Sequence, residues 1–270
     1  MKTDITFEQI KFYQQNGFLA IESILSESEL DELRAAVDEA VKSMGTRKVS
    51  VGRDDMQESN KYYDKVFTQR LNLWRINDTV KRYMLNPALG EMLCKLAGVA
   101  GIRVWHDQAL IKQPYANPTG WHLDNPYWSF TSRHSISIWI ALDDATYQNG
   151  CMFYVRGSHL VPDSHNAPIG TNIGELFDIN PAFKQKDTVG VPLKAGGCAF
   201  HNGLTAHGAS ANMTRGQRRA MTCAYMPSGS TFNGQQNILP DSYFQALKVG
   251  EELNNDELNP LIFPKKERLS

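Results

Sequence analysis

A histidine and an aspartate, His122 and Asp124, stand two residues apart in the stretch GWHLDNPYWSF, which begins at Gly120. Every second side chain of a strand points to the same face, so an imidazole and a carboxylate can reach one ion from a single strand. A metal held by two histidines and one carboxylate keeps positions open, which is typical of non-haem Fe(II) oxygenases. The pair therefore supports a metal hypothesis that needs a third ligand from elsewhere in the chain.

Two histidines in the second half of the chain compete for the third position. His207 is followed by Asn212 and by two consecutive arginines, Arg218 and Arg219. An arginine on the strand after a metal-binding histidine is well suited to a carboxylate, because its planar fork binds both oxygens. His201 lacks this pattern and precedes Asn-Gly, which indicates a turn. We favour His207 as the ligand and interpret His201 as a supporting or structural histidine.

The remaining histidines fit structural roles. His106 and Asp107 are adjacent, so on a strand they would face opposite sides and cannot chelate one ion. We interpret them as structural. His159 lies in the loop-like RGSH and is expected to form side-chain hydrogen bonds, while His134 and His165 are expected at the surface.

The composition is that of an ordinary soluble globular protein. The 270 residues are 41% hydrophobic and 21% charged, and a net charge of −1 argues against a nucleic-acid partner. No run approaches the ~20 apolar residues of a membrane span. The N-terminal MKTDITFEQI lacks the apolar core of a secretory signal, and the four cysteines are scattered. We therefore expect free thiols and a cytoplasmic location. The oligomeric state is not indicated.

The first hundred residues are predicted to be mainly helical. Ser26 and Glu29 form a capping-box signature at the start of one helix, which Gly45 would end. Pro87 suits the first turn of another helix that stops near Gly98.

From Gly101 the sequence becomes β-prone. SISIWIAL at 135–142 alternates polar and apolar residues, and further short strands are separated by Gly, Pro and Asn. Strands at this spacing predict a sandwich or barrel. No linker divides the chain, so we expect one domain over 1–270. In it, 1–100 is mainly helical support, 101–230 is the β core and 231–270 is a C-terminal extension.

The sequence resembles the phytanoyl-CoA dioxygenase-like (PhyH) family of Fe(II)/2-oxoglutarate-dependent dioxygenases. The resemblance runs from YQQNGFLAIESILSESELDELR through KQP at 112–114, WHLD at 121–124, SIWIALDDATYQNGCMFYVRGSH at 137–159 and HGASANMTRGQRRA at 207–220. It implies a double-stranded β-helix (jelly-roll, cupin-like) core with the N-terminal helical segment packed on it. It also implies Fe(II), 2-oxoglutarate and O2 as cofactor and co-substrates. The reaction implied is hydroxylation of an unactivated C–H of a small molecule, with release of succinate and CO2.

The same resemblance implies roles for particular residues. His122, Asp124 and His207 would be the iron ligands, and Arg218 would bind the distal carboxylate of 2-oxoglutarate, while Arg219 would face the opposite way. The other expected contacts to 2-oxoglutarate are Gln108, Trp139, either Gln69 or Arg70, and Ser210. Ser210 is included because relatives often carry a serine where this chain has Ala209. Related halogenases replace the carboxylate ligand, so the presence of Asp124 favours hydroxylation.

The prime substrate is not identified by the sequence, because fold does not choose it. Substrate contacts are expected from Asn125, Tyr127, Trp128, Trp74 and Arg75. The aromatic side chains suggest a ring-bearing or partly apolar molecule, and the arginines at 70, 75 and 103 leave room for an anionic group. Two other classes of protein stay open: a cupin-like metal binder or isomerase without 2-oxoglutarate, and a binding module that has lost catalysis. Arg218 discriminates the first, because only the dioxygenase needs a cation in the pocket.

Overall fold

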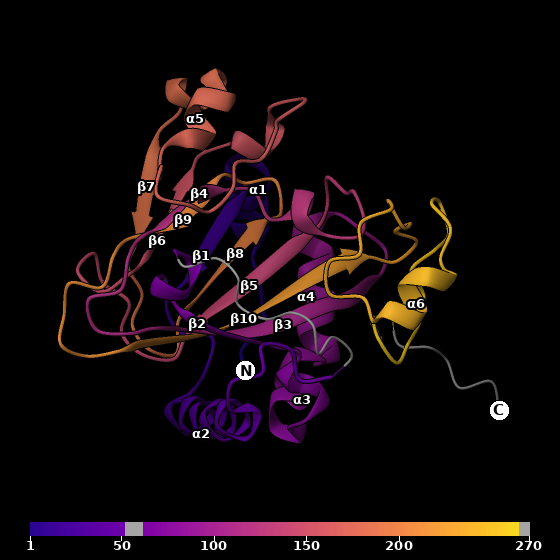
Figure 1. Ribbon diagram of the computed structural model, residues 1–270, viewed down its shortest axis with the longest axis horizontal. Coiled ribbons are helices and arrows are strands. Elements are labelled where there is room, and N and C mark those ends of the chain that lie inside the picture. Colours follow the sequence, from indigo (N-terminus) through magenta and orange to yellow (C-terminus); the bar gives the residue numbers. More distant parts are fainter. Residues whose placement is uncertain (52–61, 265–270) are drawn as a thin grey trace.

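The computed structural model describes residues 1–51 and 62–264 and places two antiparallel sheets against each other, with helices around them (Figure 1). In these ranges the α-helices are α1 Phe7–Asn16, α2 Glu27–Met44, α3 Asp78–Met84, α4 Pro87–Ala97, α5 Glu175–Ile179 and α6 Asp241–Ala246. The 3₁₀ helices are η1 Tyr63–Lys65, η2 Leu73–Arg75, η3 Asn125–Tyr127, η4 Ser158–Leu160 and η5 Pro181–Gln185. The strands are β1 Phe18–Ile21, β2 Thr68–Leu71, β3 Ile102–Lys112, β4 Thr119–His122, β5 Ile136–Ala141, β6 Met152–Val155, β7 Thr188–Val191, β8 Cys198–Asn202, β9 His207–Ala209, β10 Arg218–Pro227 and β11 Leu261–Phe263.

The larger sheet has the strand order β1-β8-β5-β10-β3-β11, and β2 also pairs with β3. The smaller sheet has the order β4-β9-β6-β7. Together they form the double-stranded β-helix expected from the resemblance. Figure 1 shows the smaller sheet beside one end of the larger one.

The two ends of the chain both contribute strands to the larger sheet. The first hundred residues, predicted to be mainly helical, also supply β1 and β2; β1 pairs with β8 and places Phe18 opposite His201. The run FLAI is only four residues long, too short for periodicity to show a strand. The C-terminal extension supplies β11, which pairs with β3. These pairings support our proposal that the chain folds as one unit.

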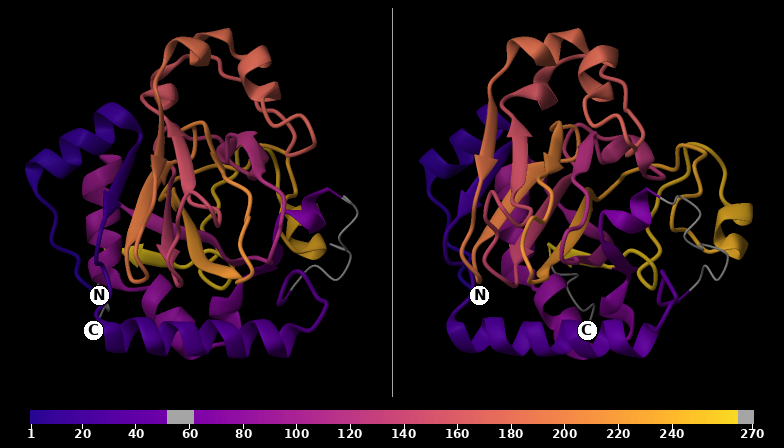
Figure 2. Two further views of the ribbon diagram at one scale, coloured as in Figure 1. Left: turned by 90° about the vertical axis from the view of Figure 1, so that its left-hand side faces the viewer. Right: turned by 60° about the vertical axis from the view of Figure 1, so that its left-hand side comes forward.

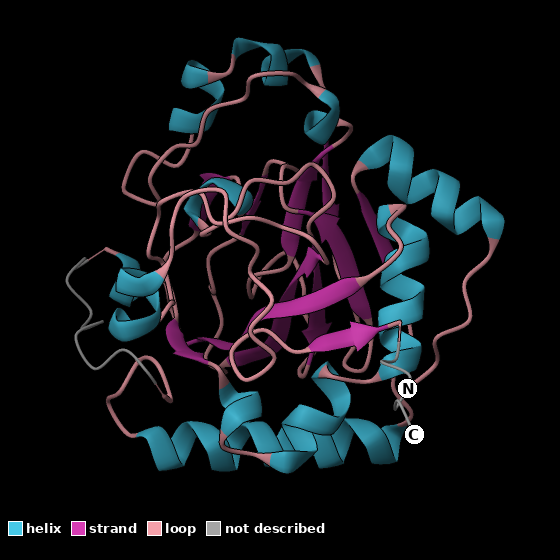
Figure 3. Ribbon diagram, turned by 90° about the vertical axis from the view of Figure 1, so that its right-hand side faces the viewer, coloured by secondary structure: helices cyan, strands magenta, loops and turns pink. Residues whose placement is uncertain are grey.

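The long helices cover the outer face of the larger sheet (Figure 2). α2 begins at the predicted capping box: Ser26 accepts from the backbone N–H of Glu29, whose side chain accepts from the backbone of Ser26. α4 begins at Pro87 and ends before Gly98, as predicted. The isoleucines of β5 pack with the buried faces of α2, α3 and α4 in one apolar cluster. Figure 3 shows these helices around the sheet from another side.

The inner face of the larger sheet lines a cavity. In β5, Ile138 and Ile140 belong to the outer apolar cluster, whereas Ser137 and Trp139 point inward. Two neighbouring strands, β10 and β3, show the same alternation, with Thr222 and Gln108 on the inner side. Strand alternation therefore separates a helix-covered apolar face from a cavity-lining face.

The segment after β10 packs near the cavity. Phe232, Ile238 and Leu253 form an apolar cluster with Trp105 and Trp128. The four cysteines are free and buried, as expected. Among the described residues, no helix combines the length and the apolar character that crossing a bilayer requires.

Candidate metal centre

Three predicted ligands meet at the junction of two paired strands. β4 and β9 are neighbours in the smaller sheet, and their register places His122 opposite His207. Asp124 follows β4 directly. One ligand atom from each of the three lies within 4.8 Å of the others. The Oδ1 of Asp124 is 3.6 Å from Nε2 of His122 and 3.7 Å from Nε2 of His207, so all three atoms converge on one point.

The backbone sets the orientation of both imidazoles. Nδ1 of His122 lies 2.9 Å from the carbonyl oxygen of Gly120, and Nδ1 of His207 lies 2.9 Å from that of Thr205. Since a carbonyl can only accept, each Nδ1 carries the proton and each Nε2 is left as a metal ligand. Burial holds the pKa of His207 well below its ordinary value, which favours the neutral ring that ligation requires.

The carboxylate of the site is ionised. Burial by itself would raise the pKa of Asp124, but the imidazoles of His207, His122 and His201 outweigh it and hold that pKa well below its usual range. His201 comes from β8 and contacts the second carboxylate oxygen. It is therefore a supporting residue beside the cluster, as interpreted from the sequence.

Arg218 is buried without a counter-charge at its free nitrogens. The residue is 2% exposed, and its Nε and Nη1 have no hydrogen-bond partner among the described residues. Its guanidinium carbon lies 5.2 Å from the centre of the Trp139 ring. Burial lowers the pKa of Arg218 to about 10, so it keeps its charge at neutral pH. Unpaired buried donors are costly, which fits a site for a small carboxylate.

Arg219 faces the other way, as predicted. It donates to both carboxylate oxygens of Asp143 and forms an ion pair with Asp38 of α2. The two consecutive arginines thus have separate surroundings, one in the cavity and one tying β10 to a helix.

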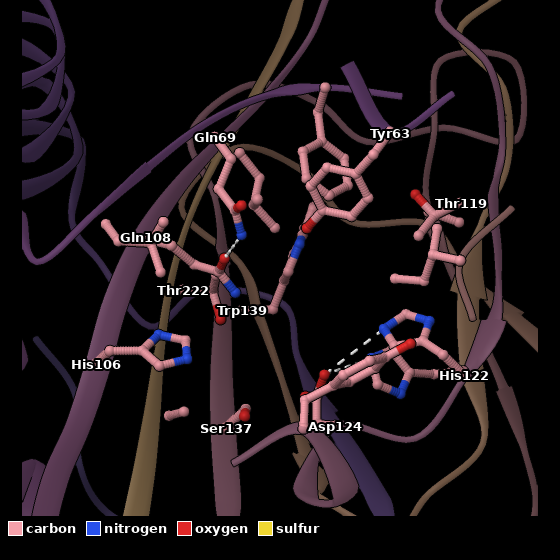
Figure 4. A pocket seen from close by; sticks show the side chains of 18 of the residues that line it. Tyr63, Gln69, His106, Gln108, Thr119, His122, Asp124, Ser137, Trp139 and Thr222 are labelled. Carbon is pink, nitrogen blue, oxygen red and sulfur yellow. Dashed lines mark hydrogen bonds and ion pairs between the residues drawn. The ribbon is translucent and has the colours of Figure 1, made fainter. Parts of the chain in front are cut away.

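A cavity of about 600 Å³ connects the metal cluster with Arg218. Trp139 and Gln108, both predicted to contact the co-substrate, line it. Gln69 lines it too, and its amide donates to the Gln108 side chain (Figure 4). Trp139 of β5 and Gln108 of β3 share one row of the strand register, and Gln69 of β2 lies in the neighbouring row.

Two other predicted co-substrate contacts lie outside this cavity. Arg70 alternates with Gln69 and points to the opposite face, where Nε and Nη2 donate to the carbonyl of Gly45 at 3.1 and 2.6 Å. Of these two residues, Gln69 is therefore the one that faces the cavity. Ser210, expected to supply the missing hydroxyl, is not among the residues that line the cavity, whereas Ala209 is.

The predicted substrate residues divide into two groups. Tyr127 and Trp128 line the cavity, and the Tyr127 hydroxyl donates to the Ala167 carbonyl at 3.0 Å. Asn125 does not: its amide donates to the Phe130 carbonyl and accepts from the Ser132 amide, so it holds a turn.

Trp74 and Arg75 also lie away from the cavity. Trp74 belongs to the apolar cluster under α2 and α3, and the Arg75 guanidinium packs over its ring at 5.7 Å. Arg103 donates to Asp256 and the Asn259 carbonyl. The arginines 70, 75 and 103 therefore do not provide the anion site that the sequence suggested.

The cavity also contains residues that sequence reasoning missed. His106, interpreted as structural, projects into it from β3 (Figure 4). The sequence did contain a signal for this position: His106 and Gln108 are two residues apart, and such residues share one face of a strand. Other lining residues that it missed include Lys48, Tyr63, Asp64, Phe67, Thr119, Ser137, Thr222, Asn237 and Ile238. Most come from segments far apart in sequence, which no local pattern connects.

Comparison with known proteins gives a consistent family signal. The model of the family described as Phytanoyl-CoA dioxygenase (PhyH) matches residues 13–220. The chain is 26% identical over 255 residues to the peroxisomal phytanoyl-CoA dioxygenase of Bos taurus, covering 87% of this chain and 74% of that one. It is 25% identical over 281 residues to the phytanoyl-CoA dioxygenase of Arabidopsis thaliana, covering 92% and 96%.

Solved structures agree with the sequence comparisons. The non-haem α-ketoglutarate-dependent carbocyclase SnoK from nogalamycin biosynthesis superposes with a TM-score of 0.78 at 28% identity, covering 96% of each chain. The epimerase SnoN, in complex with Fe³⁺, α-ketoglutarate and nogalamycin RO, superposes with a TM-score of 0.73 at 25% identity, covering 94% of this chain and 97% of that one.

Proposed function

Because the chain belongs to the phytanoyl-CoA dioxygenase family, whose reaction uses Fe(II), 2-oxoglutarate and O2, we propose that it hydroxylates an unactivated C–H bond of a small molecule. The observation that carries this proposal is that one cavity holds both the His122, Asp124 and His207 cluster and the buried Arg218, whose Nε and Nη1 have no hydrogen-bond partner among the described residues. A metal site alone does not need a buried cation. A metal site with a carboxylate-bearing co-substrate does.

The residues present fit both groups. Two neutral imidazoles and one carboxylate suit Fe(II) and leave coordination positions open for 2-oxoglutarate and oxygen. The guanidinium of Arg218 would receive the distal carboxylate, with Trp139 beside it and the Gln69–Gln108 pair closing that side of the pocket. When bound, these groups supply the oxidation: 2-oxoglutarate is decarboxylated to succinate and CO2 and one oxygen atom enters the C–H bond.

The protein itself binds, orients and excludes water. None of its side chains needs to move a proton in this scheme. Asp124 is already ionised and His207 is already neutral, so neither side chain has to gain or lose a proton. The remainder of the cavity must place one C–H bond of the substrate next to the metal, which is a positioning task.

An Asp124→Ala variant tests this proposal. With Fe(II) and 2-oxoglutarate, the wild type should release succinate, and the variant should lose most of that activity because one of three metal ligands is missing. Full succinate release by Asp124→Ala would overturn the ligand assignment. Substrate turnover by the wild type without 2-oxoglutarate would instead favour a metal-dependent isomerase.

A second outcome of the same chemistry is ring closure or epimerisation. The similarity to SnoK and SnoN, a carbocyclase and an epimerase, favours keeping it as a candidate. Turnover under ¹⁸O2 distinguishes the two, since a hydroxylated product contains one labelled oxygen and a cyclised or epimerised product does not.

A further inference from the structure

His106 lines the cavity, but the proposed function assigns it no contact with the metal or with 2-oxoglutarate. The strand register places it in one row with Ala224, Ser137 and His201, across β3, β10, β5 and β8. Gln108 and Trp139, assigned to 2-oxoglutarate, belong to the next row, which is ~6.8 Å further along the strands. His106 thus lies on the side of the cavity left for the prime substrate.

The row containing His106 forms a floor of small side chains. His106 and His201 are separated by two strands, so their backbones are about 14 Å apart at the usual strand spacing. His201 reaches Asp124 at one end of this row. The two residues between them, Ala224 and Ser137, are small and line the cavity. That leaves room for a ring system between the metal cluster and His106.

The His106 ring is held in place and is short of a partner. Its ring meets Trp128 edge to face at 6.2 Å and lies 6.4 Å from the Trp105 ring. Nδ1 is enclosed and has no hydrogen-bond partner among the described residues. The residue is only 6% exposed, although its ring faces the cavity. A ligand in the cavity cannot reach the enclosed Nδ1, so it would hydrogen-bond to Nε2, the ring nitrogen that is not enclosed, and recover part of the cost of burying the imidazole.

The rings packed against His106 are uncharged, and the Asp124 carboxylate is close enough to act on its imidazole. Trp128 stacks on Phe130 at 5.5 Å and presents a fixed aromatic wall, and Ile238 lines the cavity as well. Besides Asp124 and Arg218, the charged side chains among the described lining residues are Lys48 and Asp64. Lys48 lies over the Tyr63 ring, at the end of the cavity away from His106 (Figure 4). Burial lowers the pKa of His106 to about 4, so the ring is neutral and offers one donor and one acceptor.

We propose that His106 recognises the prime substrate, and that this substrate is an uncharged, ring-bearing small molecule whose hydroxyl or carbonyl group hydrogen-bonds to the imidazole. This inference rests on the proposed function, because it assigns the C–H to be oxidised to a ring held between His106 and the metal. A saturated acyl chain fits less well, since it would leave the imidazole buried and unpaired. Hydroxyl-bearing ligands should bind roughly five- to hundredfold more tightly than their methyl analogues.

The experiment compares two probes that differ by one group, 2-naphthol and 2-methylnaphthalene. Their dissociation constants are measured by equilibrium dialysis, without oxygen, on the protein loaded with Fe(II) and 2-oxoglutarate. The wild type should prefer 2-naphthol at least fivefold. His106→Phe, which keeps the ring but not the nitrogens, should bind both probes about equally. His106→Gln should keep part of the preference, and His134→Phe, on an exposed histidine outside the cavity, should keep all of it.

Several results would overturn the proposal. These are an unchanged preference in His106→Phe, binding of neither probe by the wild type, or tighter binding of octanoyl-CoA than of 2-naphthol. If His106→Phe does not fold, ¹⁵N-histidine NMR of the wild type replaces it. The imidazole signal absent from His106→Gln must then shift on adding 2-naphthol, and no shift overturns the proposal. Succinate release without any probe is measured in parallel, because its absence would contradict the proposed function and not the role of His106.

Discussion

His201 and Asp124 are joined by a hydrogen bond of 3.1 Å between Nε2 and Oδ2. The carboxylate is ionised, so Nε2 must donate. Nδ1 lies 3.4 Å from the Tyr154 hydroxyl, which links Tyr154 to the same ring. The other carboxylate oxygen, Oδ1, is thereby directed at His122 and His207. His201 therefore orients the carboxylate of Asp124, the proposed metal ligand.

We predict that His201→Gln weakens Fe(II) binding by roughly 10- to 100-fold, as loss of a hydrogen bond to a metal ligand generally does. Tyr154→Phe should weaken it less, because Tyr154 acts only through His201. Competition with a coloured chelator measures the affinity, with thermal unfolding as the check on folding. The matched control is His159→Gln, whose ring hydrogen-bonds to the Gln14 carbonyl and does not line the cavity. Equal losses in His201→Gln and His159→Gln would contradict a positioning role.

The two consecutive arginines should give opposite phenotypes. Arg218→Gln removes the buried cation beside Trp139, so KM for 2-oxoglutarate should rise at least tenfold in the succinate assay. Arg219→Gln should leave that KM unchanged and lower the stability by about 1 kcal/mol, the order expected for a partly exposed ion pair. A raised KM in Arg219→Gln alone would show that the two roles are exchanged.

Gln69 and Arg70 provide a second matched pair. Gln69→Ala removes a cavity side chain and its hydrogen bond to Gln108, so KM for 2-oxoglutarate should rise a few-fold. Arg70→Ala loses hydrogen bonds to the Gly45 carbonyl, so the free energy of unfolding should fall by about 1–3 kcal/mol with no change in KM. Denaturant titration and the succinate assay separate the two effects, and a KM change in Arg70→Ala would contradict the orientation described.

His106 and Asp107 should make opposing contributions to the pH dependence of stability. Burial lowers the pKa of His106 to about 4, so its contribution to stability grows as pH rises from about 4 towards 6.5. Burial raises the pKa of Asp107 to about 7, although the amides of Leu73 and Trp74 donate to its carboxylate. Its contribution is therefore full below about 4 and is lost as pH rises towards 7.

Single variants should separate the contributions of His106 and Asp107 to the pH dependence of stability. Relative to the wild type, His106→Gln should become less stable as pH rises from 4.5 to 6.5, and Asp107→Asn should become more stable. Each slope is limited to about 1.4 kcal/mol per pH unit, the value for one proton. Urea unfolding at several pH values measures it. Curves parallel to the wild type in both variants would contradict the assigned pKa directions.

The sequence by itself was sufficient to predict where two helices begin, which face of one strand is polar and which residues could bind a metal. Capping residues placed the starts of α2 and α4, because those signals act over three or four residues. Alternation in SISIWIAL placed Trp139 on the polar side of its strand, and that side lines the cavity. The His-x-Asp pair and the later histidine indicated a metal cluster, because residue type and spacing limit which atoms can share an ion.

Only the tertiary structure decided which neighbouring side chains face the cavity. Gln69 rather than Arg70 lines it, and Trp74 and Arg75 lie under the helices, because the pairing of β2 with β3 sets a register that sequence spacing does not contain. His106 became a candidate substrate residue for the same reason: four strands place it in one row with His201, 95 residues away in the chain. Local patterns determine elements, whereas long-range strand pairing determines which of their faces meet.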